Sequence, residues 1–180
     1  MRLGNCPGEL AAHDGADVES GRFDVVFPLL HGPYGEDGTV QGLLELAGVP
    51  YVGAGVAASA VGMDKELARA VFSASGLPQT GFAVIRRSDW RENPNLVVQE
   101  VERDFDYPLF IKPVNLGSSV GISKAHDRDE MIQGIDSAGV YATKILIEVS
   151  VEQAREIECA VLGEEDPEVS GVGELSLIHI

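Results

Sequence analysis

A lysine stands inside the apolar run Pro108–Pro113 (PLFIKP), with three apolar residues before it and a proline after it. Such a run predicts a β-strand. An ammonium group held in an apolar strand must pair with an anion or lower its pKa. Lys112 is therefore a candidate for binding an anionic ligand. The alternative is an edge-strand lysine whose ammonium group reaches water.

The loop after this lysine favours the anion-binding interpretation. Asn115–Gly121 (NLGSSVG) is predicted to be a mobile loop because it is rich in glycine and serine. Its backbone amides and the hydroxyls of Ser118 and Ser119 could fold over phosphate groups as donors. A plain hairpin turn is the alternative. The loop is not a GxxxxGK[ST] phosphate loop, and no GxGxxG follows a predicted strand.

Two more residues could contact a ligand. Lys65 begins a predicted helix in GMDKELARA and could bring a second positive charge to a nucleotide. His31 enters a loop rich in glycine and proline, His31–Gly38 (HGPYGEDG), which could hold a small polar substrate. The alternatives are a solvated lysine at a helix start and a surface histidine in a tight turn.

Carboxylates lie at the end of the chain's later strands. Glu148 ends the apolar run ILIE, where its carboxylate could accept a hydrogen bond from the exocyclic amine of adenine. Glu156 and Glu158 alternate along a predicted strand and so share one face. Surface glutamates in salt bridges are the alternative.

The chain has 180 residues, which suits one ordinary domain or two small ones. Its net charge of −16 disfavours nucleic-acid binding but leaves room for a phosphorylated small ligand held by a local group of lysines. Cys6 and Cys159 are far apart and form no CxxC pair, so a reducing, cytoplasmic location is expected. The sequence shows no secretory signal and no membrane-spanning run.

The elements that position these residues follow an α/β pattern. Phe23–Leu30 predicts a buried strand, qualified by a proline within it. Thr39 is predicted to be the N-cap of a helix that Gly48 ends, and Val49–Val52 predicts a short strand. Ligands tend to bind at the loop after the first strand of such a unit.

A second set of elements begins at Asp64, predicted to cap a helix that ends before Gly76. A strand is expected at Phe82–Ile85. The remaining expected elements are one short helix within Arg86–Asp106, a helix over Asp127–Ala138, and strands over Ile145–Val151 and Ile157–Leu162. Residues 1–20 are predicted to be loop.

Three stretches in this order resemble the D-alanine–D-alanine ligase family. They are HGPYGEDGTVQGLLELAGVPYVGAGVAASAVGMDK, FIKPVNLGSSVGISK, and ILIE followed by REIECAVLG, and the resemblance runs from about Phe23 to Gly173. It implies an α/β fold of the ATP-grasp type. Residues 1–62 would be a partial N-terminal α/β (pre-ATP-grasp) domain. Residues 63–180 would be a truncated ATP-grasp domain, with a central α+β lid subdomain (63–147) and the start of the C-terminal subdomain (148–180).

The resemblance also implies the role of each residue at the site. Lys65 and Lys112 would contact the phosphates of ATP, and Ser118 and Ser119 would lie in the lid. Ser118 would also help to position the first D-alanine, beside His31.

The base and the ribose would be bound further along the chain. Glu148 would bind the adenine amine, with backbone groups offered by Val149 and Val151, and Glu156 would hold the ribose hydroxyls. ATP would phosphorylate one D-alanine, and the amine of a second D-alanine would attack the acyl phosphate. Mg²⁺ or Mn²⁺ would assist. The family also implies a homodimer.

The sequence departs from the family pattern at both ends. Residues 1–22 do not match the family's Gly-Gly loop with its substrate-binding glutamate, and Leu175–Ile180 (LSLIHI) does not continue the pattern. The family's Asp, Glu and Asn metal ligands come later, so no metal ligand is assigned here. We expect an incomplete gene product that does not turn over by itself.

Three alternatives stay open at this point. A D-alanine–D-lactate ligase shares these motifs, and a fragment could serve only nucleotide binding or dimerisation. Another ATP-grasp carboxylate–amine ligase is the third, although the HGPYGEDG…MDK block argues against it.

Overall fold

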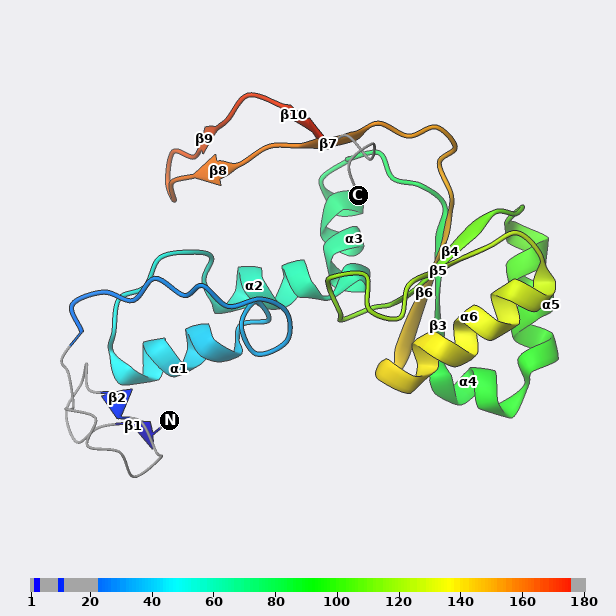
Figure 1. Ribbon diagram of the computed structural model, residues 1–180, viewed down its shortest axis with the longest axis horizontal. Helices are drawn as coiled ribbons and strands as arrows, with labels where there is room; N and C mark the ends of the chain where they lie inside the picture. Colours follow the sequence, from blue (N-terminus) through cyan, green and yellow to red (C-terminus); the bar gives the residue numbers. More distant parts are fainter. Residues whose placement is uncertain (1, 4–9, 12–22, 176–180) are drawn as a thin grey trace. The chain divides into compact units, whose positions relative to one another are not determined.

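The computed structural model describes residues 2–3, 10–11 and 23–175 (Figure 1). The chain divides into two compact units, Met1–Ser150 and Val151–Ile180, and each is described by itself. Strands β1 (Arg2–Leu3) and β2 (Leu10–Ala11) pair antiparallel. The loop predicted over residues 1–20 was therefore wrong at these four residues, because the two segments pair with each other, and the rest of that prediction lies outside the described residues. Among the described helices, none is long and apolar enough to cross a membrane.

The first unit contains a four-stranded antiparallel sheet in the order β3-β6-β4-β5. Its strands are β3 (Phe82–Arg86), β6 (Lys144–Val149), β4 (Leu109–Pro113) and β5 (Ser123–Ala125). The strands predicted over the β3, β4 and β6 segments are confirmed, with ends shifted by one or two residues. Strand β5 was not predicted; it is only three residues long, too short to show an alternating pattern.

Alternation along the strands gives this sheet two different faces. Leu109, Ile111, Ile145 and Ile147 point into the core and are fully buried. The residues between them along β4 and β6 point to the other face, which therefore carries Lys112. The apolar face fixes the strand register, because a slip of one residue would bring polar side chains into the core.

Three helices cover the apolar face (Figure 1): α4 (Arg87–Glu92), α5 (Pro94–Asp104) and α6 (Arg128–Tyr141). The prediction of one short helix before β4 was wrong, because Asn93 ends α4 and caps α5. Its side chain accepts a hydrogen bond from the backbone N–H of Leu96 at 3.2 Å, and the proline at the start of α5 needs no N–H partner. Helix α6 is present as predicted and runs three residues further.

Helices α1 (Thr39–Ala47), α2 (Val56–Met63) and α3 (Lys65–Ala74) precede the sheet. Helix α2 was not predicted, because its small apolar residues (VAASAVGM) give no helical periodicity and no side chain caps it.

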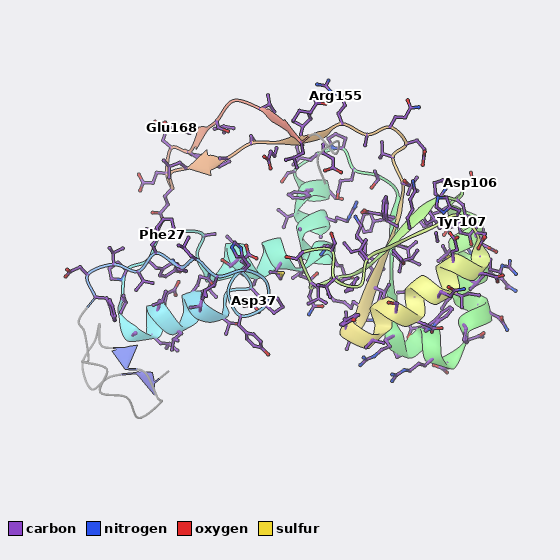
Figure 2. All side chains as sticks on the ribbon, in the orientation of Figure 1. Phe27, Asp37, Asp106, Tyr107, Arg155 and Glu168 are labelled. Carbon is purple, nitrogen blue, oxygen red and sulfur yellow. The ribbon has the colours of Figure 1, made fainter. Side chains whose placement is uncertain are left out.

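The predicted N-cap of α1 was wrong. Gly38 is the cap, with a left-handed backbone (φ 92°), and the side chain that bonds the helix start belongs to Asp37. Its carboxylate accepts from the N–H of Thr39 at 3.0 Å and of Tyr34 at 2.9 Å. Asp37 is labelled in Figure 2. Asp37 lies two residues before the helix, and its carboxylate takes the capping role that was predicted for Thr39. Gly48 ends α1 with φ 66°, as predicted.

The strands predicted at Phe23–Leu30 and Val49–Val52 reduce to one parallel bridge between Val26 and Tyr51. Side chains of the first run are largely exposed, with Phe27 65% exposed. Two segments with one bridge bury little apolar surface, and Pro28 has no N–H to donate. The parallel direction and the intervening helix agree with the predicted α/β unit.

The second unit consists of two short antiparallel pairs, β7 (Glu156–Glu158) with β10 (Gly173–Leu175) and β8 (Val161–Leu162) with β9 (Glu168–Val169). The single strand predicted over Ile157–Leu162 is therefore broken in two. Within this unit every residue whose burial the structure describes is exposed.

Candidate functional site

The start of α3 is tied to the start of β6 by a group of charges. The Asp64 carboxylate caps the helix, accepting from the N–H groups of Glu66 at 3.0 Å and Leu67 at 3.1 Å. The ammonium group of Lys144 then donates to Asp64 at 2.7 Å and to Glu66 at 2.6 Å. The predicted cap at Asp64 is confirmed. This fixes where α3 begins and so where Lys65 lies.

Four charged side chains meet on the polar face of the sheet. The two oxygens of the Glu148 carboxylate are shared, since Lys112 contacts one and Arg69 contacts the other. Lys65 approaches from the first turn of α3 and donates to the backbone carbonyl of Leu116. Lys65, Lys112, Arg69 and Glu148 form what we call the cation cluster. They line a cleft of about 480 Å³ together with Gly62, Ala68, Phe72, Gln79, Thr80 and Leu146.

The cation cluster holds three positive charges around one negative charge, in a chain whose net charge is −16. Burial lowers the pKa of Lys65, and the nearby charge of Lys112 lowers it further, while Glu148 and Asp64 partly oppose the shift. Two ammonium groups that repel each other in a partly buried cleft would both be stabilised by an anion placed between them.

The loop Asn115–Gly121 connects β4 to β5 beside this cluster. Ser118 and Ser119 both have left-handed backbones, with φ of 51° and 58°, and both side chains are exposed. Non-glycine residues seldom adopt this conformation. The N–H of Val120 donates to the carbonyl of Gly117 at 3.2 Å, so the two serines are the central residues of a tight turn, where consecutive left-handed residues are expected. The loop is held to the cluster through Leu116, whose carbonyl accepts from Lys65.

The structure brings together Lys65, Lys112 and Glu148, three of the residues that sequence reasoning selected, with the serine loop next to them. It also adds Arg69, which sequence reasoning missed. The available signal was spacing: Arg69 is four residues after Lys65 and so lies on the same helix face.

The other predicted residues are not among those that line the cleft of the cation cluster. His31 is exposed and lines a separate pocket of about 460 Å³ beside α1. Val149 ends β6, and its N–H donates to the carbonyl of Gly81 at 3.0 Å. Val151 and Glu156 belong to the second unit, where both are exposed.

A second cleft, of about 580 Å³, also reaches Lys65. It is lined by the loop residue Gly117, by Glu36, and by Gln41 and Ser59 from α1 and α2. Gln41 is buried, with its Nε2 donating to the carbonyl of Gly35 at 3.0 Å while its Oε1 has no partner among the described residues. This cleft offers both donors and acceptors to a small polar molecule next to the cation cluster.

A metal site does not emerge from the described residues. Within residues 2–3, 10–11 and 23–175, no three His, Cys, Asp or Glu side chains are grouped so that they could hold a metal ion. The described residues therefore do not fit the divalent cation that the resemblance implies, and no reaction step is assigned to one.

The four-stranded sheet with its covering helices gives the α/β fold of the ATP-grasp type, and family comparisons agree. A family model described as "D-ala D-ala ligase C-terminus" matches residues 71–179, and one described as "D-ala D-ala ligase N-terminus" matches residues 7–54. The chain belongs to the D-alanine–D-alanine ligase family.

Individual relatives cover most of this chain. A D-alanine–D-alanine ligase of Bacillus velezensis is 51% identical over 158 residues, which are 88% of this chain and 44% of the relative. The structure of the Coxiella burnetii D-alanine–D-alanine ligase has a TM-score of 0.77 at 38% identity and covers 87% of this chain and 46% of its own. The structure of the VanG D-Ala:D-Ser ligase of Enterococcus faecalis has a TM-score of 0.76 at 40% identity. The match covers 84% of this chain and 43% of the VanG chain. The chain spans less than half the length of these relatives.

Replacing Asp64 by alanine should lower the free energy of unfolding by about 1–2 kcal/mol near pH 7, because the helix cap and one of the two carboxylate partners of Lys144 are both lost. Burial alone would raise the pKa of Asp64, but hydrogen bonds from Lys144 and two backbone N–H groups outweigh it and lower the pKa. The stabilisation from this charge is therefore complete above about pH 4 and is lost as the pH falls through the lowered folded-state pKa.

Urea unfolding followed by the fluorescence of Trp90, the one tryptophan, measures this effect. Asp64→Asn is the matched control, since asparagine caps a helix as well as aspartate but carries no charge. We expect the alanine variant to be the least stable at neutral pH and the wild type to lose its advantage over the asparagine variant at low pH. Equal stability of all three proteins near pH 7 would contradict the assignment.

Proposed function

We propose that this chain supplies the nucleotide-binding part of an ATP-dependent D-alanine–D-alanine ligase, with the cation cluster as the ATP site. One observation carries the proposal: Lys112 and Arg69 pair with a single carboxylate, and Lys65 lines the same cleft, in a strongly acidic chain. The net charge of the cluster is positive, so it favours an anion, and a polyphosphate supplies several negative oxygens within reach of both lysines.

Each residue of the proposal has a defined task. Lys65 and Lys112 neutralise the phosphates, and the hydroxyls and amides around Ser118 and Ser119 close over them. Glu148 accepts a hydrogen bond from the exocyclic amine of adenine once Lys112 turns to the phosphates. Such positioning and charge neutralisation account for most of the catalysis of phosphoryl transfer.

The remaining assignments are carried from the family resemblance. Val149 and Val151 offer backbone groups to the base, and Glu156 holds the ribose hydroxyls. His31 and Ser118 position the first D-alanine. The resemblance also implies Mg²⁺ or Mn²⁺, for which the described residues offer no site. The proposal also includes a homodimer and a cytoplasmic location, where ATP is available.

D-Alanine is the proposed second substrate. The relatives from Bacillus velezensis and Acetivibrio thermocellus, at 51% and 52% identity, are both D-alanine–D-alanine ligases. The D-Ala:D-Ser ligase VanG is 40% identical. An assay of a full-length ligase that contains this chain, offered D-alanine, D-serine and D-lactate together, would test this choice through the identity of the product.

Calorimetric titration of the chain with ATP and with AMP tests the site. ATP should bind at least about tenfold more tightly, because only its outer phosphates can satisfy both Lys65 and Lys112. Equal affinity for the two nucleotides, or no binding, would overturn the proposal. ADP release on addition of D-alanine is followed in parallel. We expect none from this chain, and steady release would contradict that expectation while leaving the nucleotide site in place.

A further inference from the structure

The Glu148 carboxylate is held by two cations that come from different elements. Lys112 reaches one oxygen from β4, and Arg69 reaches the other from α3. The three side chains are mostly buried, with exposed fractions of 22% for Lys112, 15% for Arg69 and 12% for Glu148. A ligand that draws Lys112 away leaves Glu148 with Arg69 as its partner within the cluster.

Arg69 is also held by Thr80 and Phe82, which belong neither to β4 nor to the serine loop. Its guanidinium carbon lies 4.6 Å from the centroid of the Phe82 ring, and its nitrogens reach the carbonyl and the hydroxyl of Thr80, each at 3.4 Å. None of these contacts comes from β4 or from the serine loop. The guanidinium should therefore keep its place when Lys112 and the loop bind phosphate.

Strand register places the ring beside the carboxylate. Phe82 on β3 is the cross-strand partner of Glu148 on β6, so their side chains project from the same face of the sheet. The guanidinium lies over the ring and contacts the carboxylate at the same time. A planar group with several donors suits this double contact better than an ammonium group does.

We propose that Arg69 is a positioning residue that holds Glu148 as a fixed hydrogen-bond acceptor and thereby selects 6-aminopurine over 6-oxopurine nucleotides. The inference rests on the proposed ATP site and adds to it the residue that sets base specificity. With one oxygen anchored by Arg69, the other is left to accept from a 6-amino group. A 6-oxo group would instead bring a carbonyl oxygen against a partly buried carboxylate, which costs affinity.

The test compares ATP with ITP, which carries an oxygen in place of the 6-amino group. Dissociation constants for both are measured by calorimetry for the full chain and for Arg69→Met and Arg69→Lys, with Arg91→Met as the control on α4. Methionine keeps the long apolar stem without the charge. Trp90 fluorescence confirms that each variant is folded.

We expect the wild type to prefer ATP by about tenfold or more, and Arg69→Met to lose most of that preference through weaker ATP binding, with ITP affinity changed by no more than about twofold. Arg69→Lys should restore part of the preference, and Arg91→Met should keep all of it. If Arg69→Met does not fold, Arg69→Lys carries the test and must lower the ratio by about threefold or more.

An unchanged ratio of the ATP and ITP dissociation constants in the Arg69 variants would overturn the inference alone. If both affinities also fall equally, the role of Arg69 is merely structural. A wild-type chain that binds neither nucleotide would overturn the proposed ATP site, and this inference with it. The two failures are therefore distinguishable from the wild-type titration.

Discussion

Replacing Lys112 by methionine should weaken ATP binding by about a hundredfold, the largest effect expected from any single residue of the site. Lys112 is held in the cleft by a strand whose opposite face is fully buried, so its backbone position is fixed by the core. Its removal should also raise the pKa of Lys65 toward the usual value for lysine, since the charge of Lys112 is one of the causes that lower it.

Lys124→Met is the matched control. Lys124 is exposed on the adjacent strand β5 and, like Lys112, lies near the ring of Phe110, at 5.7 Å against 5.1 Å. Both variants remove one positive charge, so a general electrostatic effect would weaken ATP binding equally. A loss confined to Lys112→Met, measured by calorimetry, supports a direct contact. Equal losses, or full affinity in Lys112→Met, would remove Lys112 from the site.

Replacing Ile147 by alanine should lower the free energy of unfolding by about 2–5 kcal/mol, which is a large part of the stability of an ordinary domain. Ile147 is fully buried on β6, between β3 and β4, and packs in the main core. The loss combines the transfer of the side chain with the cavity left behind, because close-packed neighbours relax only in part.

Ile157→Ala is the control for this variant, since it makes the same chemical change at a residue of the second unit that is 51% exposed. It should change the unfolding free energy by no more than about 0.5 kcal/mol. Urea unfolding followed by Trp90 fluorescence gives both values. Comparable values for the two variants would show that β6 is not the centre of the core.

The sequence predicted the strands of the main sheet because their signal is local. The strand Leu109–Pro113 is an apolar run in which one lysine stands out. Asp64 was identified as a cap because a cap needs only its own side chain and the next few N–H groups. The strand predicted at Phe23–Leu30 was wrong because a strand also needs partners, which no local pattern reveals.

The parts of the site that the sequence did not reveal depend on distant contacts. Arg69 and Glu148 are 79 residues apart, and their ion pair exists only because α3 lies against the polar face of the sheet. Lys144 is 80 residues from Asp64 and appears in the sequence as an ordinary surface lysine. Helix α2 gave no amphipathic pattern at all. Local patterns and the family resemblance supplied the lysines and Glu148, but the contact of Arg69 with Glu148 required the fold.

The charges along α3 limit how this segment of the chain can change in length. Asp64 and Lys65 stand at the helix start, and Arg69 follows one turn later on the same side. One residue inserted between Lys65 and Arg69 would rotate everything after it by about 100° around the helix axis. Arg69 would then face away from Glu148 while Lys65 stayed in place. Insertions and deletions in this turn should therefore be eliminated by selection more strictly than most substitutions there.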